Sequence, residues 1–591
     1  MSGSHGSSGH ITVTRAATSP GTRPDISLRE TLTVLAVFAA AAAALFATAP
    51  VGGDFWWSDA PRHALNGAFI KDLLAARPFS DPAGWAMQYY VRYPALTILF
   101  YPPAFYIVEA GFYAVFGVTH AIAQLAVAPY VVLLGFAATA IARTALPRWS
   151  AIGVGLLAIG TPEIAFWGRQ VMLDVPAYAT LLCGVMFFIR HLRRDRTADL
   201  ALAAAFLVAA VYTKQTVIFI LPALLTGFVT ARGAASLLQR RVVVTAVLAA
   251  VALIPAVYLT MRFGAVNVES VAGRPADLSR WSLDAWLFYP LLVPRQLGWP
   301  VTVAGLCGLI ALIFRPLPAG ERWGAPLLLA WLASGYLFFS LIAVREPRHD
   351  LMALFPLVLC AALLPHVLLP AIPAQFLVMG LAVGTFGYSL IFAPPPLVAG
   401  YREIAGYVAS TAPPNAVVLY SGYRDGNYVF DMREHAERGD ITTIRADKLL
   451  LRVAVERARG VVQTGQDEAG IAEELRDLGI SMVVAQPGFW TDLRQMARLE
   501  RVLNSPLFKQ VAEFPVTGTL STNDGSGVIR IYCPTYPVET PRGNIRIDMP
   551  LMRGNIEGRI GASPIGPPRG PIPPGASPLD PTKGLPLEPT H

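Results

Sequence analysis

The segment Val51-Gly-Gly-Asp-Phe-Trp-Trp-Ser-Asp-Ala-Pro-Arg-His-Ala-Leu-Asn-Gly-Ala-Phe-Ile-Lys-Asp72 directly follows the first hydrophobic run of the chain. Its second half has the pattern of an amphipathic helix. Asp59 occupies a position suited to an N-cap, and Pro61 lies in the first turn, where its missing N–H has no consequence. The apolar stripe of this helix is formed by Leu65, Phe69 and Leu73. The segment therefore predicts a short helix at a membrane surface.

The polar side chains at the start of this helix form a candidate site. Residues three and four positions apart are neighbours on a helix, so Asp59, Arg62 and His63 share one face. Trp56 and Trp57, just upstream, suit the boundary between water and lipid. A carboxylate, a guanidinium and an imidazole that meet at this boundary predict a functional site. The alternative is a solvated interfacial helix with incidental charges.

Composition places the chain among membrane proteins. Of its 591 residues, 54% are hydrophobic and 15% are charged. This is typical of a polytopic membrane protein with room for a soluble domain. The net charge of +8 is best explained by loops that face anionic lipid, and it does not indicate nucleic-acid binding. The four cysteines show no spacing typical of a metal knuckle or a disulfide framework.

About eleven apolar runs have the length, or nearly the length, of a membrane span. One further stretch, 95–117, contains Pro102, Pro103 and Glu109. If it crossed the membrane, the arginine clusters at 190–196 and 232–241 would face outside, against the positive-inside rule. We therefore expect a helix that lies in or dips into the outer surface. The predicted spans are 29–49, 119–143, 149–166, 174–190, 199–213, 216–231, 241–261, 298–314, 325–344, 350–368 and 374–393.

This arrangement predicts an α-helical polytopic membrane protein with a cytoplasmic N-terminus and a C-terminal α/β extracytoplasmic domain. In the last domain, strand-like runs at 416–420 and 481–485 alternate with helical patterns at 467–478 and 490–503. The arginine-rich composition hints at a bacterial source, so the expected location is the bacterial inner membrane. The expected divisions are a disordered N-terminus 1–26, a transmembrane domain 27–393, a linker 394–400, the α/β domain 401–535 and a Pro/Gly-rich disordered tail 536–591.

A second carboxylate and a lysine are expected on the same outer face as Asp59. Asp174 begins an apolar run, five residues after Arg169, and could either act in a site or stabilise a helix N-terminus. Lys214 interrupts two apolar runs at the outer edge of the membrane. An ionisable residue at that depth indicates a function, and the alternative is snorkelling to the interface.

Several cationic residues complete the candidate site. Arginine forks bind phosphate oxygens through two parallel hydrogen bonds, which suits a lipid-phosphate headgroup. With two carboxylates on the same face, the pattern predicts a pocket for a phosphorylated lipid. The residues expected to form it are Arg62, Arg92, Lys214, Arg345, Arg348 and His349.

Motifs of other enzyme classes are absent from the sequence. It contains no Asp-x-Asp pair, no GxxxxGK[ST] loop and no HExxH segment. A metal-bound nucleotide-sugar donor, nucleotide hydrolysis and zincin chemistry are therefore not expected. His63 beside a carboxylate is weak evidence for a metal site.

The successive motifs resemble those of the polyprenyl-phosphate-dependent GT-C glycosyltransferases. This class includes the protein O-mannosyltransferases and the lipid A aminoarabinose transferase. The resemblance covers residues 29–535 and includes two stretches of the outer domain, 420–427 and 444–448. The motifs that carry it are Trp57-Ser-Asp-Ala-Pro-Arg-His63, Tyr89-Tyr-Val-Arg-Tyr-Pro94, Arg169-Gln-Val-Met-Leu-Asp174, Tyr212-Thr-Lys214 and Arg345-Glu-Pro-Arg-His349.

The resemblance implies roles for individual residues. Asp59 takes the place of the catalytic carboxylate of the first loop, and Asp174 that of the acidic residue of the second loop. The donor phosphate would contact Arg92, Lys214 and Arg348. His63, Arg169 and Tyr93 are further site candidates. The chain has Ala60 where the family often has Glu, and it lacks an acidic residue beside Arg92. No cofactor is therefore expected, and a required divalent metal is doubtful.

These parts predict sugar transfer from a polyprenyl-phosphate donor to a hydroxyl of a glycan, lipid or protein, with membrane lipids as further partners. Because polyprenyl phosphate is a good leaving group, its departure needs cationic stabilisation rather than a second acid. Asp59 is the expected general base, with inversion at the sugar, and Asp174 orients the acceptor or Arg62. Alternatives are a transporter or flippase for lipid-linked saccharides, and a non-catalytic scaffold.

Overall fold

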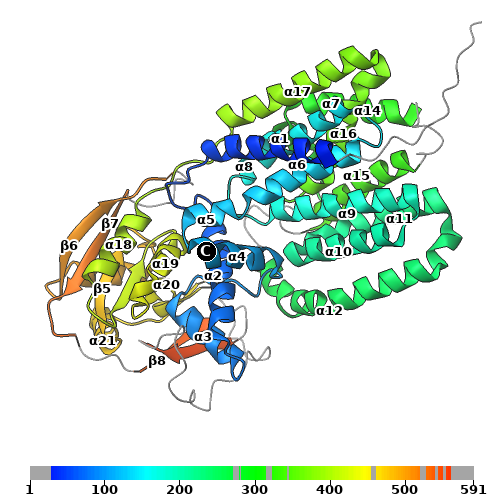
Figure 1. Ribbon diagram of the computed structural model, residues 1–591. Helices are drawn as coiled ribbons and strands as arrows, with labels where there is room; N and C mark the ends of the chain where they lie inside the picture. Colours follow the sequence, from blue (N-terminus) through cyan, green and yellow to red (C-terminus); the bar gives the residue numbers. More distant parts are fainter. Residues whose placement is uncertain are drawn as a thin grey trace, which may run out of the picture.

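The structure is a computed structural model, and it describes residues 28–269, 279, 281–314, 323–342, 345–453, 461–518, 527–538, 543–549 and 554–560. Helices form the larger part of the molecule, and a mixed sheet with its own helices stands at one side of them (Figure 1). The predicted N-terminal segment 1–26 and the end of the tail, 561–591, lie outside the described residues.

The helical part begins with α1 (Leu28–Ala47), which is followed by the helices of the first loop. These are α2 (Ala60–Ala76), α3 (Pro82–Arg92) and α4 (Ala104–Phe116). The other helices are α5 (His120–Leu125), α6 (Ala128–Ala142), α7 (Arg148–Gly160), α8 (Pro162–Trp167), α9 (Asp174–Arg194), α10 (Thr197–Thr213), η1 (Gln215–Ile220), α11 (Leu221–Arg232), η2 (Ala234–Leu238), α12 (Arg240–Glu269), α13 (Leu283–Leu297), α14 (Trp299–Phe314), α15 (Gly324–Leu341), η4 (Leu351–Leu354), α16 (Phe355–Leu368) and α17 (Ala371–Phe392).

Within the described residues, eight helical segments are long and apolar enough to cross a membrane, or nine if the pair α13 and α14, bent by 118°, counts as one span. The chain is thus a multi-pass membrane protein. Two of the eleven predicted spans are shorter than expected, because α7 ends at Gly160 before Thr161 and Pro162, and α10 has 17 residues. Apolar side chains of α12, such as Val251 and Ile254, are more than half exposed, as expected of a surface that faces lipid.

The stretch 95–117 forms one short helix, α4, with 13 residues. This length is too small for an ordinary span of about 20 residues. It packs closely against α2, because a Cβ atom added to Gly67 would lie 2.6 Å from the Cβ of Glu109. Its predicted position in the outer membrane surface remains a prediction.

The C-terminal part confirms the predicted α/β domain. Its mixed sheet has the strand order β2-β1-β5-β7-β6, in which β1 pairs parallel with β2 and β5, and β7 pairs antiparallel with β5 and β6. The elements are α18 (Tyr401–Thr411), β1 (Val417–Ser421), α19 (Asp425–Glu434), η5 (Ala436–Arg438), β2 (Thr442–Arg445), α20 (Ala446–Leu449), β3 (Leu451–Val453), β4 (Val461–Gln463), α21 (Glu468–Asp477), β5 (Ile480–Ala485), α22 (Arg494–Leu503), β6 (Phe508–Pro515) and β7 (Val528–Pro534).

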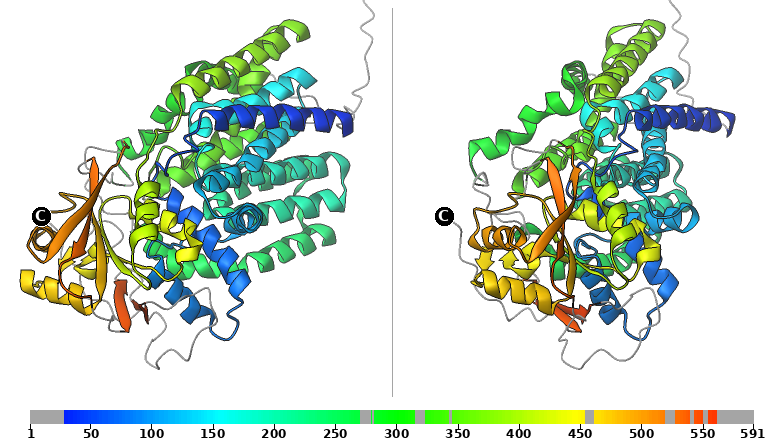
Figure 2. Two further views of the ribbon diagram at one scale, coloured as in Figure 1. Left: turned by 60° about the vertical axis from the view of Figure 1, so that its left-hand side comes forward. Right: turned by 90° about the vertical axis from the view of Figure 1, so that its left-hand side faces the viewer.

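The outer domain forms several hydrogen bonds with the first loop of the membrane domain. Asp54 forms an antiparallel bridge with Val398, and its carboxylate accepts a hydrogen bond from the backbone N–H of Tyr401 at 3.0 Å. Arg424 donates to the carbonyl oxygens of Phe55 and Trp56 at 3.3 and 2.8 Å. The views of Figure 2 place α19 and α20 between the sheet and the first-loop helices. The beginning of α2 is therefore held by both domains.

The prediction that no fold follows residue 536 is wrong for part of the tail. Strands β8 (Asn544–Met549) and β9 (Gly554–Arg559) pair antiparallel and pack on α3. Gln88 of α3 and the backbone of Arg559 exchange two hydrogen bonds, of 2.7 and 2.8 Å. Alternating isoleucines at 545, 547 and 556 bury one face of the hairpin, a period-two pattern that the Pro- and Gly-rich surroundings obscured.

Candidate active site

Asp59 stands at the N-cap position of α2, as predicted, but its carboxylate accepts no capping hydrogen bond from the helix backbone. It contacts other side chains instead. One oxygen accepts hydrogen bonds from Arg348 Nη2 at 3.0 Å and from Trp57 Nε1 at 3.2 Å. The Asp59 side chain is 40% exposed, although its neighbour Ala60 is buried. A carboxylate at the start of α2 thus faces outward, where another molecule can reach it.

Asp174 and Asp59 contact the same cation, the guanidinium of Arg348. As the first residue of α9, it contacts Lys214 Nζ through Oδ1 at 2.6 Å and Arg348 Nη1 through Oδ2 at 3.7 Å. Lys214 ends α10 and is buried. Arg348 therefore bridges two carboxylates whose positions in the sequence are 115 residues apart. The structure brings together four predicted residues, which we call the Arg348 cluster: Asp59, Asp174, Lys214 and Arg348.

The guanidinium of Arg348 is fixed on several sides. Its Nε contacts Glu346 Oε2 at 2.6 Å, and its Nη1 lies 3.8 Å from the sulfur of Met172. The rings of Trp57 and Trp167 lie 5.4 and 5.1 Å from its central carbon. Trp57 thus packs on a cation in the site as well as lying near a membrane surface. Glu346 lies within the motif at 345–349, but its local sequence gives no sign that it contacts Arg348.

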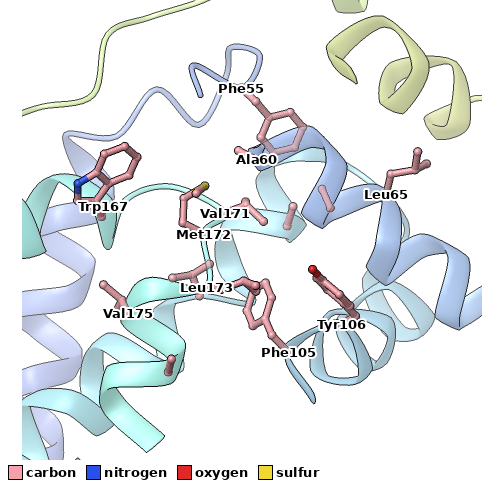
Figure 3. Packing of buried hydrophobic residues seen from close by; sticks show 14 of the residues in the cluster. Phe55, Ala60, Leu65, Phe105, Tyr106, Trp167, Val171, Met172, Leu173 and Val175 are labelled. Atoms are coloured by element: carbon pink, nitrogen blue, oxygen red, sulfur yellow. The ribbon is translucent and has the colours of Figure 1, made fainter. Parts of the chain in front are cut away.

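An apolar wall backs the cluster. Figure 3 shows Met172 and Leu173 between Trp167 and the first turn of α2, at Ala60. Val171, Met172 and Leu173 are all buried and form the connection that leads into Asp174. A wall of this kind lowers the local dielectric constant and strengthens the attraction between Arg348 and the carboxylates.

Charge around Asp59 favours its ionised form. Burial alone would raise the pKa of its carboxyl, but the positive charge of Arg348, with smaller effects of His63 and Arg62, holds that pKa below its usual value. For Arg348, burial would lower the pKa, yet the carboxylates Asp174, Glu346 and Asp59 raise it. Asp59 is therefore an anion, and Arg348 a cation, at neutral pH.

The two histidines of the site are neutral. Burial lowers the pKa of His63 to about 4, and burial and the charge of Lys214 lower that of His349 to about 4. His63 Nδ1 lies 2.9 Å from the hydroxyl of Tyr106, and its ring lies 5.5 Å from that of Tyr101. His349 can therefore offer a phosphate an N–H group but no positive charge.

Two tyrosines near the cluster were not predicted. Burial raises the pKa of Tyr101, and the charge of Asp59 adds to this effect; the Tyr101 ring lies 5.5 Å from that of His63. Tyr106 fixes the ring of His63. Both come from the stretch just before and within α4, where the sequence indicated only apolar character.

Arg62 points to the outer domain, and this differs from the predicted group with Asp59. Its guanidinium pairs with Asp425 of α19 at 3.1 Å, and Arg445 pairs with the same carboxylate at 2.6 Å. Helical spacing places Arg62 on the same face of α2 as Asp59, but it could not show that Asp425 of the outer domain is the carboxylate that Arg62 pairs with. Arg62 now ties α2 to the outer domain.

Arg92 and Tyr93 pack at the same junction. Arg92 is buried over the ring of Tyr93, with 5.7 Å between its central carbon and the ring centre. Arg433 of α19 also lies near this ring, with its central carbon 5.9 Å from the Tyr93 ring centre. Arg433 forms a buried pair with Asp72 at 2.6 Å. Among the described residues, these contacts of Arg92 and Tyr93 belong to the interface between domains.

Arg169 and Arg345 make contacts that hold helix ends. Arg169 is buried and donates to Thr48 Oγ1 at 2.7 Å and to the carbonyl oxygens of Ser389 and Ala393 at 2.9 and 2.6 Å. It thereby connects the ends of α1, α8 and α17. Arg345 donates to the carbonyl oxygen of Ser340, in the last turn of α15, at 3.0 Å. These contacts support the fold around the site, and a role in donor binding remains untested.

In the part of the chain that the structure describes, no group of three or more His, Cys, Asp or Glu side chains is arranged to hold a metal ion. In the Arg348 cluster, each carboxylate already faces a cationic side chain. These described residues do not form a metal centre by themselves.

Comparisons with known proteins agree with this architecture. A family model described as dolichyl-phosphate-mannose-protein mannosyltransferase matches residues 101–259. Among curated proteins, none matches the chain in sequence.

Solved structures resemble the chain over most of its length. ArnT from Cupriavidus metallidurans, bound to undecaprenyl phosphate, has a TM-score of 0.58 at 16% identity and covers 87% of this chain and 100% of its own. The same protein in the apo state has a TM-score of 0.56 at 17% identity, and the match covers 86% of this chain and 98% of ArnT. Arabinofuranosyltransferase AftD from Mycobacteria has a TM-score of 0.53 at 15% identity, and the match covers 89% of this chain and 41% of AftD.

The resemblance noted in the sequence is therefore confirmed for the fold, and the family model covers the part of the chain that contains the motifs at 169–174 and 212–214. The chain is a multi-pass membrane protein of the GT-C fold that resembles the polyprenyl-phosphate-dependent glycosyltransferases.

Proposed function

We propose that this protein transfers a sugar from a polyprenyl-monophosphate donor to an acceptor hydroxyl, at the extracytoplasmic face of the bacterial inner membrane. The observation that carries the proposal is Arg348, which joins the partly exposed Asp59 to the buried Asp174 and Lys214. The carboxylate proposed as the base and the cations proposed to bind phosphate thus belong to one connected group of side chains.

Donor phosphate would be held by Arg348 and Lys214. Both cations are anchored by carboxylates, and the N–H groups of Arg348, which here face Asp59, Asp174 and Glu346, would match phosphate oxygens once such contacts are exchanged. Positive charge there stabilises the phosphate as it leaves with the bonding electrons of the C1–O bond. The proposal is supported by ArnT, a protein of similar fold whose structure was solved bound to undecaprenyl phosphate.

Donor binding would also prepare Asp59 as the base. The Arg348 nitrogen that now contacts Asp59 at 3.0 Å could turn to the phosphate, which reduces the positive field on the carboxylate. The pKa of Asp59 would then rise towards its ordinary value, making it a better proton acceptor. Asp59 takes the proton of the acceptor hydroxyl while the oxygen of that hydroxyl forms a bond to C1 of the sugar. Polyprenyl phosphate leaves from the opposite face of C1, so the configuration at C1 inverts.

The test is release of polyprenyl phosphate from synthetic prenyl-phosphate sugars by the purified protein in lipid, with membrane extract and purified glycans as acceptors. Loss of a general base typically lowers rates by about 10²- to 10⁴-fold, and we expect Asp59→Asn to fall in this range. Asp477→Asn, a change of the same kind on α21 of the outer domain, should retain the rate.

Two results would contradict the proposal. Asp59→Asn at the wild-type rate, with an unchanged melting temperature, would exclude Asp59 as the base. Donor binding without release across the whole panel of donors and acceptors would instead indicate a transporter or a binding protein.

A further inference from the structure

One side chain near the end of α13 holds the segment that carries Arg348. This segment, 345–350, lies between α15 and η4 and is neither helix nor strand. Gln296 donates through Nε2 to the carbonyl oxygen of Pro347 and to Oδ1 of Asp350, both at 2.6 Å. Pro347 directly precedes Arg348, and Asp350 follows it by two residues. The amide of Gln296 therefore holds the chain on both sides of the cation proposed to bind phosphate.

These two hydrogen bonds are shielded from water, because Gln296 and Asp350 are both buried. The carbonyl oxygen of Pro347 can only accept, so the nitrogen of the amide has to face it, and the orientation of Gln296 is determined. A buried polar atom that loses its partner destabilises the fold more than an exposed one does. An apolar residue at position 296 would leave both oxygens unpaired, and the segment would have to shift to find another donor.

The residue next to Gln296 reaches Arg348 by a second route. Arg295 Nε contacts Oε1 of Glu163, in α8, at 3.1 Å. The other oxygen of that carboxylate accepts from Trp167 Nε1 at 2.8 Å. The ring centre of Trp167 lies 5.1 Å from the central carbon of Arg348. Two consecutive residues of α13 thus support both the chain that carries Arg348 and a ring that packs on its guanidinium.

The end of α13 is itself well connected. The helix ends before Gly298, whose φ of 84° favours glycine and whose N–H donates to the carbonyl oxygen of Pro294 at 3.0 Å. The chain then bends by 118° into α14, where Thr302 Oγ1 donates to the carbonyl oxygen of Gly298 at 2.9 Å. A cation that stabilises a leaving group has to be preorganised, and a helix end closed on both sides can hold it.

We propose that Gln296 is a positioning residue, which keeps the guanidinium of Arg348 at the place where the donor phosphate binds, with Arg295 as a second support. Gln296 acts through Arg348 and is assigned no contact with the donor. The role of Arg348 in donor binding rests on the function proposed above, whereas the contacts of Gln296 do not.

Binding can be measured without turnover, by titrating undecaprenyl phosphate onto the full-length protein in nanodiscs. Gln296→Leu removes the amide at similar volume. Only molecules with Arg348 in place can then bind, so we expect the Kd to rise about tenfold. In the transfer reaction the loss should appear in KM for the donor, with kcat little changed. Gln375→Leu is the matched control, because that amide donates to Ala371 of its own helix, α17, at 3.2 Å, and it should bind as wild type does.

The same hydrogen bond can be tested from its other end. Asp350→Leu removes the acceptor and should weaken binding, whereas Asp350→Asn keeps an oxygen that accepts and should retain the wild-type Kd. The double variant Gln296→Leu/Asp350→Leu should bind as Gln296→Leu does, because both changes remove one shared contact. Melting temperatures show which variants are folded at the assay temperature. If Gln296→Leu does not fold, the two Asp350 variants decide.

The outcomes separate this inference from the proposed function. Weaker binding by folded Gln296→Leu and Asp350→Leu, with wild-type binding by Gln375→Leu and Asp350→Asn, supports it. A folded Gln296→Leu protein with the wild-type Kd and KM overturns it and leaves the proposed function intact. A lower melting temperature without a change in Kd also overturns it, because it marks a purely structural role. Wild-type binding by Arg348→Leu would refute the donor-phosphate site itself, and the inference with it.

Discussion

At the scale of single residues, the site depends on how one guanidinium is shared. Arg348 contacts Asp59, Asp174 and Glu346, and its side chain is 7% exposed. Three carboxylates around Arg348 leave the local charge negative even when Lys214 is counted, so an incoming phosphate must compete with groups of its own sign. The site can therefore hold the cations in place without a donor and release them to a donor.

Glu346 is predicted to position Arg348 without touching substrate. The change Glu346→Gln removes the charge from a 2.6 Å contact while keeping the shape of the side chain. Hydrogen bonds to charged groups contribute about 1.5–3 kcal/mol, which corresponds to a fall in kcat/KM of about 10- to 100-fold. We expect most of this loss in KM for the donor, because the cation is displaced rather than removed. A loss confined to kcat would contradict a positioning role.

The pH profile of kcat/KM should show no decrease caused by the titration of a histidine. The pKa of Asp59 lies below its usual value, so the free enzyme keeps its base ionised as the pH falls towards 4 and loses it only below that. The pKa of His63 is about 4, so this ring stays neutral over the same interval. We expect kcat/KM to be flat between about pH 5 and 7, within the interval where an ordinary histidine titrates. A decrease centred near pH 6.5 that disappears in His63→Gln would show that His63 titrates there.

At the scale of elements, the interface between α2 and α19 is fixed by a buried ion pair. Arg433 contacts both oxygens of Asp72, at 2.6 Å, and one of these oxygens also accepts from the Tyr89 hydroxyl at 3.0 Å. Both charged side chains are buried. Because α2 begins at the carboxylate proposed as the base, this pair sets the orientation of the catalytic helix against the outer domain.

Removal of one partner of this pair should be severe. Asp72→Ala leaves the Arg433 charge buried without its anion, which typically costs about 3–5 kcal/mol. The double variant Asp72→Ala/Arg433→Leu removes both charges and should recover much of the lost thermal stability. The measurement is the melting temperature in detergent, together with the rate of proteolysis in the outer domain. Additive losses in the double variant would show that the pair is not coupled.

At the scale of the whole molecule, the proposed chemistry depends on segments that are distant in sequence. The Arg348 cluster takes residues from the first loop, from the beginning of α9, from the end of α10 and from the segment between α15 and α16. The outer domain then covers the first loop through Arg424 and Asn427, which donate to the carbonyl oxygens of Phe55 and Trp56. The first loop, which carries Asp59, is thus held in place by contacts between the two domains.

Much of the site was predictable because membrane topology constrains it. Once the arginine-rich loops are assigned to one side, Asp59, Asp174, Lys214 and Arg348 must all lie at the opposite side. The hydrophobic pattern also predicted the α/β domain, since strands β1 and β5 are short apolar runs between helical patterns. These features follow from local periodicity and from the free-energy cost of placing charges in lipid.

Other features follow from the tertiary structure alone. The sequence determined a multi-pass membrane protein with an outer α/β domain and a shared side for the polar residues, because hydrophobicity and charge act locally. It did not determine that Arg62 pairs with Asp425 or that Arg433 pairs with Asp72, contacts that span more than 350 residues. A local pattern shows which face a charge occupies, whereas its partner depends on which distant carboxylate the fold brings within hydrogen-bonding distance.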